Sequence, residues 1–211
     1  MTARKIRTLL AAAGATAVAA VAAAPAGAGL LVASAPGCTS PDSDQVFSPW
    51  ADYANYFLAP DGGFEGGASG WALDGGAGVA AANSSFAVSG DGSSALAVPN
   101  GASATSPTVC VGLEHPTVRF FARKTSGSGV VPALNTLRVD VLVEDNLGVV
   151  SALPVGVVGS SSSWQPTAPM LVTASLLPLL PGAHTPVAFR FTPQGGDWQV
   201  DDVYVDPTGS R

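Results

Sequence analysis

Aromatic side chains are the residues of this sequence whose type suits ligand binding most clearly. A flat ring packs against the C–H face of a sugar, and polar groups beside the ring can bond the sugar hydroxyls. Trp164 is the first candidate, because it follows the serine run 160–163 after a strand-like segment. Trp50 and Tyr53 are the next candidates. The sequence therefore predicts a sugar-stacking site at these three residues, with packing against a sheet edge as the alternative use of the rings.

Groups that could carry out catalysis are sparse. The chain has two histidines, His115 and His184, and no Gly-x-Ser-x-Gly frame surrounds a serine. Cysteine and histidine spacing for zinc is absent. Glycoside hydrolysis needs two carboxyl groups, and Asp140, Glu144 and Asp145 could supply them. Their pattern, however, places them on the solvated face and the turn of a strand pair. We therefore predict that the chain is not an enzyme, with an unrecognised extracellular hydrolase as the remaining alternative.

The N-terminal residues have the three parts of a secretory signal peptide. Three basic residues within 4–7 precede the apolar run 9–24, and Ala26-Gly27-Ala28 forms a small-residue cleavage site. A cleavage site at residues 33–35 is weaker because a proline follows it, and an uncleaved anchor and a lipoprotein signal are further alternatives. This pattern predicts a signal peptide over 1–28, an irregular lead-in over 29–44 and one β-sandwich domain over 45–211, located outside the cell.

The charge of the exported part disfavours two classes of partner. Removing three of the nine basic residues leaves six against 15 acidic residues, which is a net charge of −9. Nucleic acids and anionic lipid surfaces both require a basic patch. We therefore expect no nucleic-acid partner and no membrane role beyond export. A neutral ligand or a cation such as calcium remains compatible with this charge.

The two cysteines agree with an oxidising compartment. Cys38 and Cys110 are expected to form one disulfide, whose loop closure stabilises the fold by about 4 kcal/mol in the chain-entropy model. The alternative is a lipidated Cys38 and a buried, free Cys110. Thiol titration under denaturing conditions distinguishes the two, because the disulfide leaves no free thiol.

Hydrophobic alternation predicts an all-β fold. The apolar positions of 137–144 alternate, and a turn at 145–148 leads into the apolar run 149–158, which together predict a hairpin. Further strands are expected at the ranges 77–82, 94–98, 117–123, 187–192 and 198–205. No part of 29–211 has a helical period with caps. The expected architecture is a single β-sandwich of the jelly-roll type.

Two segments resemble a known family. The stretch DGGFEGGASGW (Asp61–Trp71) and the stretch WQVDDVYVDP (Trp198–Pro207) resemble the first and last strands of galactose-binding-like jelly rolls in secreted carbohydrate-binding modules. The chain as a whole is similar to exported proteins of high-GC bacteria. The resemblance implies that these two segments are neighbouring antiparallel strands, with Trp71 and Trp198 in the core.

The resemblance also implies a structural calcium ion where the two segments meet. It assigns Glu65 and one of Asp201 and Asp202 as ligands, with backbone carbonyls completing the shell. The hydrophobic pattern around the two aspartates predicts a β-bulge that turns one of them towards the site. The alternative is that Glu65 caps backbone N–H groups at a glycine turn while both aspartates face solvent.

These observations lead to three hypotheses for function. The preferred one is a secreted, non-catalytic β-sandwich domain that binds carbohydrate or a cell-surface glycan. The second is a structural or interaction scaffold without a small-molecule ligand, and the third is the hydrolase named above. A cluster of exposed aromatic side chains would favour glycan binding. The oligomeric state is not predicted.

Overall fold

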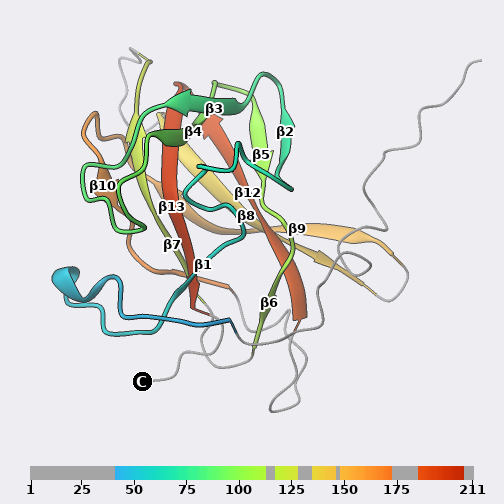
Figure 1. Cartoon of the computed structure of the whole chain (residues 1–211). Helices are drawn as coiled ribbons and strands as arrows, with labels where there is room; N and C mark the ends of the chain where they lie inside the picture. The colour runs from blue at the N-terminus through green and yellow to red at the C-terminus, as the bar shows by residue number, and fades with distance from the viewer. Residues whose placement is uncertain (1–40, 113–116, 128–134, 146–147, 173–184, 207–211) are drawn as a thin grey trace, which may run out of the picture.

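The computed structural model describes residues 41–112, 117–127, 135–145, 148–172 and 185–206. The predicted signal peptide, Cys38 and both histidines lie outside these ranges. Within them, strands form two antiparallel sheets, and the only helical element is the short 3-10 helix η1 (Ser48–Trp50) (Figure 1). No helix of the described part is long and apolar enough to cross a membrane. The predicted all-β sandwich is confirmed.

One sheet has seven strands and the other has six. The seven-stranded sheet has the order β10-β7-β13-β4-β3, with β1 also paired to β13 and β11 to β7. Its strands are β1 (Phe57–Leu58), β3 (Gly78–Ala81), β4 (Ser94–Val98), β7 (Thr117–Lys124), β10 (Gln165–Pro166), β11 (Met170–Leu171) and β13 (Trp198–Asp206). The six-stranded sheet has the order β2-β5-β12-β8-β9, with β6 also paired to β12. Its strands are β2 (Ala72–Asp74), β5 (Ser103–Thr105), β6 (Val109–Val111), β8 (Thr136–Glu144), β9 (Val150–Val158) and β12 (Thr185–Gln194).

The predicted hairpin forms the long edge of the six-stranded sheet. Val141 of β8 lies opposite Leu153 of β9 on one side and opposite Phe189 of β12 on the other. Because side chains alternate along a strand, this register directs Val139, Val141 and Phe189 to the same face, where all three are buried. The alternation read from the sequence therefore identifies the core face correctly.

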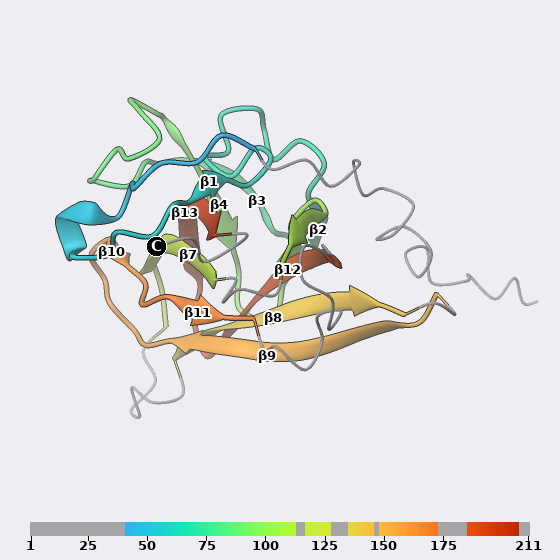
Figure 2. The same cartoon turned by 90° about the horizontal axis from the view of Figure 1, so that it is seen from below.

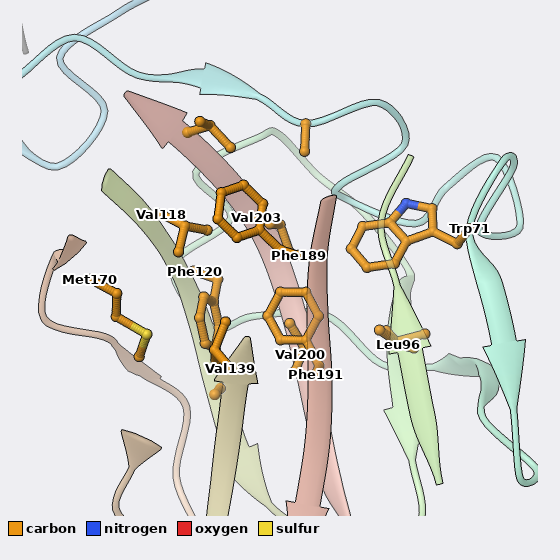
Figure 3. Packing of buried hydrophobic residues seen from close by; sticks show 14 of the residues in the cluster. Trp71, Leu96, Val118, Phe120, Val139, Met170, Phe189, Phe191, Val200 and Val203 are labelled. Atoms are coloured by element: carbon orange, nitrogen blue, oxygen red, sulfur yellow. The ribbon is translucent and has the colours of Figure 1, made fainter. Parts of the chain in front are cut away.

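The main core lies between the two sheets (Figure 3). Phe120 of β7 meets Phe191 of β12 edge to face, with 5.1 Å between the ring centroids. Trp71 closes one end of this core and lies 5.9 Å from Phe191. Trp198 is also buried in the same cluster. The predicted core positions of both tryptophans are confirmed.

A second apolar cluster covers the outer face of the seven-stranded sheet. On β7, Phe120 points into the main core, whereas the next residue, Phe121, belongs to the outer cluster. The segment that carries η1 crosses this face, and its Phe47 stacks on Phe121 with 5.7 Å between the centroids. The side chains of this cluster are therefore packed like those of an interior.

The stretch Asp61–Trp71 is a series of turns, so its predicted assignment as the first strand is wrong. The Asp61 carboxylate accepts hydrogen bonds from the N–H groups of Gly66 and Ser69, at 2.8 and 2.6 Å, and these bonds hold the turns. The stretch does meet β13 as predicted, because Val203 donates its N–H to the carbonyl of Gly62 at 3.0 Å. A Cβ atom at Gly62 would lie 2.7 Å from the Val203 carbonyl oxygen, so only glycine permits this approach. The antiparallel partner of β13 here is β1.

Candidate functional site

Strand β13 is bulged at its pair of aspartates. Its register on β7 shifts between Asp201 and Tyr204, and Asp202 has a φ of 52°, in the left-handed region. A bulge adds one residue to a strand and re-aims the side chains beside it. The predicted bulge is confirmed. Both aspartates are fully buried, so the alternative prediction that they face solvent is wrong.

Serine and backbone groups satisfy the buried carboxylates. Asp201 accepts the backbone N–H of Ser84 on Oδ2 at 2.6 Å and the backbone N–H of Asp202 on Oδ1 at 2.8 Å. Asp202 accepts the hydroxyls of Ser84, at 2.9 Å, and of Ser89. The loop between β3 and β4 is thereby held against the bulge, because a buried carboxylate without partners is costly.

Glu65 holds the other end of the same loop. Its Oε1 accepts the backbone N–H groups of Ser93 and Ser94, at 2.7 and 2.8 Å. These bonds lower the pKa of the exposed Glu65 carboxyl below its usual range. The loop contains Gly90 and Gly92, so Glu65 caps backbone N–H groups beside glycines, as one half of the alternative prediction has it.

The three acids lie near one another, and burial dominates their electrostatics. Burial, with smaller contributions from the negative charges of Asp202 and Glu65, raises the pKa of Asp201 to about 7. The backbone N–H groups that Asp201 accepts oppose this rise. Ionising Asp201 in the fold therefore costs free energy.

The oxygen atoms near the bulge do not suit the calcium ion that the resemblance implies. Carboxylate oxygens are suitable ligands, but each oxygen of Asp201 and Asp202 already accepts a hydrogen bond from the protein. Among the described residues, no group of three or more acidic, histidine or cysteine side chains is placed to hold a metal ion. The oxygens in this arrangement do not fit the ion. No calcium-binding measurement bears on the ligation by Glu65 with Asp201 or Asp202, so it stays a prediction.

A groove of about 770 Å³ lies at the margin of the outer face, between the η1 segment and β11. Trp50 and Tyr53, two of the predicted ligand-binding residues, both line it. Tyr53 is 64% exposed, the highest value among the large hydrophobic residues of the described part. Leu171 lines the opposite side. We call this feature the Tyr53 groove.

A buried polar network forms the wall of the Tyr53 groove. Arg119 pairs with Asp52 at 2.6 Å and donates from Nε to the carbonyl of Thr167 at 2.6 Å. The hydroxyl of Tyr56 donates to the same Asp52 oxygen at 2.9 Å and accepts from Thr117 at 3.2 Å. Burial raises the pKa of Tyr56 to about 12, so its hydroxyl remains a donor at neutral pH. The sequence did not identify this network; the only sequence signal is the charge of Arg119 between the apolar residues Val118 and Phe120.

Trp164 does not belong to the groove, contrary to its prediction as the first candidate. Its ring is only 6% exposed and packs in the outer cluster. The guanidinium of Arg123 covers the ring at 4.8 Å from its centroid. A ring buried to this extent offers no open face for sugar stacking.

Phe86 connects the acid cluster to the groove. It belongs to the loop that Asp201, Asp202 and Glu65 hold, and its ring meets Trp50 edge to face at 5.2 Å between centroids. Phe86 also lies 5.1 Å from Phe121. The position of Trp50 in the groove thus depends on packing from the held loop.

The remaining candidate residues lie elsewhere. Asp140 is buried rather than solvated, and it accepts hydrogen bonds from Arg138 at 2.9 Å and Arg190 at 3.4 Å on the six-stranded sheet. Its predicted place on a solvated face is wrong. Cys110 lies in β6, and because Cys38 is outside the described residues, their disulfide stays a prediction.

Comparison with known proteins finds likeness of fold only. No family model matches the sequence, and no curated protein matches it. The CBM22-1 xylan-binding domain from Paenibacillus barcinonensis Xyn10C is 12% identical, with 82% of this chain and 100% of that domain covered and a TM-score of 0.51. The CBM22-1-CBM22-2 tandem domain of the same protein is 13% identical, with coverage of 74% and 46% and a TM-score of 0.52. The enzymatically active domain of bacteriophage CBA120 tailspike protein 4 is 16% identical, with coverage of 70% and 21% and a TM-score of 0.47.

The chain spans about half of the tandem domain and about a fifth of the tailspike domain. At these identities the matches to the two family 22 modules establish the fold. The β-sandwich that the resemblance implied is therefore confirmed, whereas nothing in these matches supports the likeness to exported proteins of high-GC bacteria.

Proposed function

We propose that this chain is an exported, non-catalytic β-sandwich domain that binds a neutral polysaccharide in the Tyr53 groove. The observation that carries the proposal is the exposed ring of Tyr53 beside the Asp52–Arg119 network. The ring supplies a stacking surface for sugar C–H groups, and the network supplies fixed polar atoms at its edge. Because hydrogen bonds already hold the network, a ligand meets a preformed wall.

The charges that line the groove favour a neutral ligand. Asp52 and Asp206 contribute two carboxylates, and Arg119 contributes one cation that is already paired. An anionic glycan would meet an excess of negative charge here, in a chain that is acidic overall. Neutral chains such as xylan meet no such repulsion. The xylan-binding neighbour shares the fold and supplies a first probe.

A binding role also accounts for the groove better than catalysis does. Asp52 is engaged by both Arg119 and Tyr56, so it anchors the wall and is not positioned as a free acid or base. The scaffold hypothesis predicts no use for an exposed tyrosine beside such a network. We therefore treat the scaffold as the outcome that remains if no glycan binds.

Retention on insoluble xylan, with galactan and glucan in parallel, tests the proposal. Tyr53→Ala should weaken binding by about 1–3 kcal/mol, or about 5- to 150-fold, because it removes the stacking ring. Leu73→Ala is the control, since Leu73 is partly exposed on β2 of the other sheet. Equal retention of wild type and Tyr53→Ala would show that the groove is not the site. Failure of the wild type on all three polysaccharides would leave the scaffold hypothesis.

A further inference from the structure

A second hollow lies beside the Tyr53 groove. It has a volume of about 590 Å³ and lies between the end of β9 and the segment that runs from β10 to β11. Figure 2 shows this segment between β9 on one side and the η1 segment on the other. Val157, which is 59% exposed, contributes to its lining together with Ser161 and Gln165. We call it the Val157 hollow.

The two depressions share one wall. Pro169 and Leu171 line both the Tyr53 groove and the Val157 hollow, so they form a single ridge between them. Leu171 is 58% exposed on this ridge. Tyr53, Leu171 and Val157 are thus three of the most exposed large hydrophobic residues of the described part, and they follow one another across the same surface. Exposed apolar side chains that gather in this way mark a binding surface.

We propose that the groove and the hollow form one continuous track, and that the ligand is an internal segment of a neutral polysaccharide crossing the Leu171 ridge. The inference rests on the proposed function and extends it from one sugar site to an extended chain. Each depression is as large as a complete small-molecule site, so a single sugar unit fills neither of them. A chain that enters one depression and leaves through the other uses both.

The chemistry of the Val157 hollow suits a neutral sugar. None of the described residues that line it is charged, while Val157 and Leu171 offer apolar surface and Ser161 and Gln165 offer polar groups. β9 also ends the strand order of its sheet, and an edge strand presents a row of backbone N–H and C=O groups outside the ladder. Such a rim of donors and acceptors around an apolar floor matches the hydroxyl rim and C–H faces of a sugar ring. An ionic partner finds no counter-charge there.

The dependence of affinity on chain length tests the track. Calorimetry should use oligosaccharides cut from the polysaccharide that retains the wild type, and for xylan these are xylobiose through xylohexaose. We expect the longest to bind at least about tenfold more tightly than the shortest, because only the longer chain reaches across the ridge. Equal affinities per mole for short and long chains would overturn the inference.

A pair of matched variants localises the effect. Val157→Ser should lower the affinity for xylohexaose several-fold and leave xylobiose unchanged. Val149→Ser is the control, because Val149 is 55% exposed, immediately precedes β9 and lines neither depression. Both sites are at the surface, so equal melting temperatures are expected. If Val157→Ser leaves the affinity for xylohexaose unchanged while Tyr53→Ala abolishes binding, the track is wrong and the Tyr53 groove stands. If no saccharide of any length binds the wild type, the proposed function fails, and this inference fails with it.

Discussion

Asp201 should make the stability of this protein depend on pH between about 4 and 7. Burial, together with the charge of Asp202, raises its pKa from 3.8 to about 7 in the fold. Because the folded pKa is the higher one, the folded protein binds the proton more tightly, and the resulting stability is complete below pH 4. It is lost as pH rises through 7. A difference of about three pKa units corresponds to about 4 kcal/mol of unfolding free energy.

Denaturant unfolding at a series of pH values measures this effect. The wild type should lose up to about 4 kcal/mol between pH 4 and pH 7.5, whereas Asp201→Asn, which does not titrate, should not show that slope. In Asp201→Asn one carboxylate oxygen is replaced by an NH2 group, which cannot accept the hydrogen bond from the N–H of Ser84 or Asp202. The variant should therefore be less stable than the wild type at pH 4. The two histidines are present in both proteins, and their contribution cancels in the difference between the curves.

Two results would refute the electrostatic account of the bulge. One is a wild-type stability that rises relative to that of Asp201→Asn between pH 4 and 7, since this requires Asp201 to be ionised more easily in the fold than in the unfolded chain. The other is parallel curves for the wild type and Asp201→Asn. Either result would mean that hydrogen bonds from the loop outweigh burial and the charge of Asp202.

Three further predictions follow from other contacts. Gly62→Ala should destabilise the fold by about 1–3 kcal/mol in thermal or urea unfolding, because the new Cβ meets the Val203 carbonyl oxygen at 2.7 Å. Gly78→Ala is the control and should change the stability little, because a Cβ there meets nothing within 4 Å. Phe86→Ala should weaken polysaccharide retention although Phe86 does not line the groove, because Trp50 loses one of its two edge-to-face partners, and unchanged retention would disprove that coupling. Adding excess calcium to chelator-treated protein should leave the melting temperature unchanged, because protein donors already satisfy the aspartates; a rise of several degrees would instead support calcium ligation.

The long strands could be predicted from the sequence because their alternation records burial directly. β8 and β12 each have enough residues for a period of two to be visible, whereas β9 was predicted as the apolar run after a turn. β10 and β11 have two residues each, which is too short for any periodicity. Their positions are set by pairing with β7, a contact between segments far apart in the chain.

The candidate site was predicted only in part for the same reason. Tyr53 and Trp50 could be named because aromatic type alone makes them candidates. The burial of Trp164 depends on Arg123, more than forty positions away, and the Asp52–Arg119 pair joins the η1 segment to β7. The bulge at Asp201 was visible because it breaks a pattern within one strand. Local sequence patterns therefore predicted the strands and the β-bulge. The groove could not be predicted in this way, because segments far apart in the chain form it.

The most direct test of the binding site is to map xylohexaose contacts by the amide chemical shifts of the labelled wild-type protein. We expect the shifts to concentrate in residues 50–54 around Tyr53 and in residues 169–171 on the ridge, and to extend to 155–159 at the end of β9. Shifts that leave these three ranges unchanged and concentrate on the outer face of β8 and β12 would contradict this expectation.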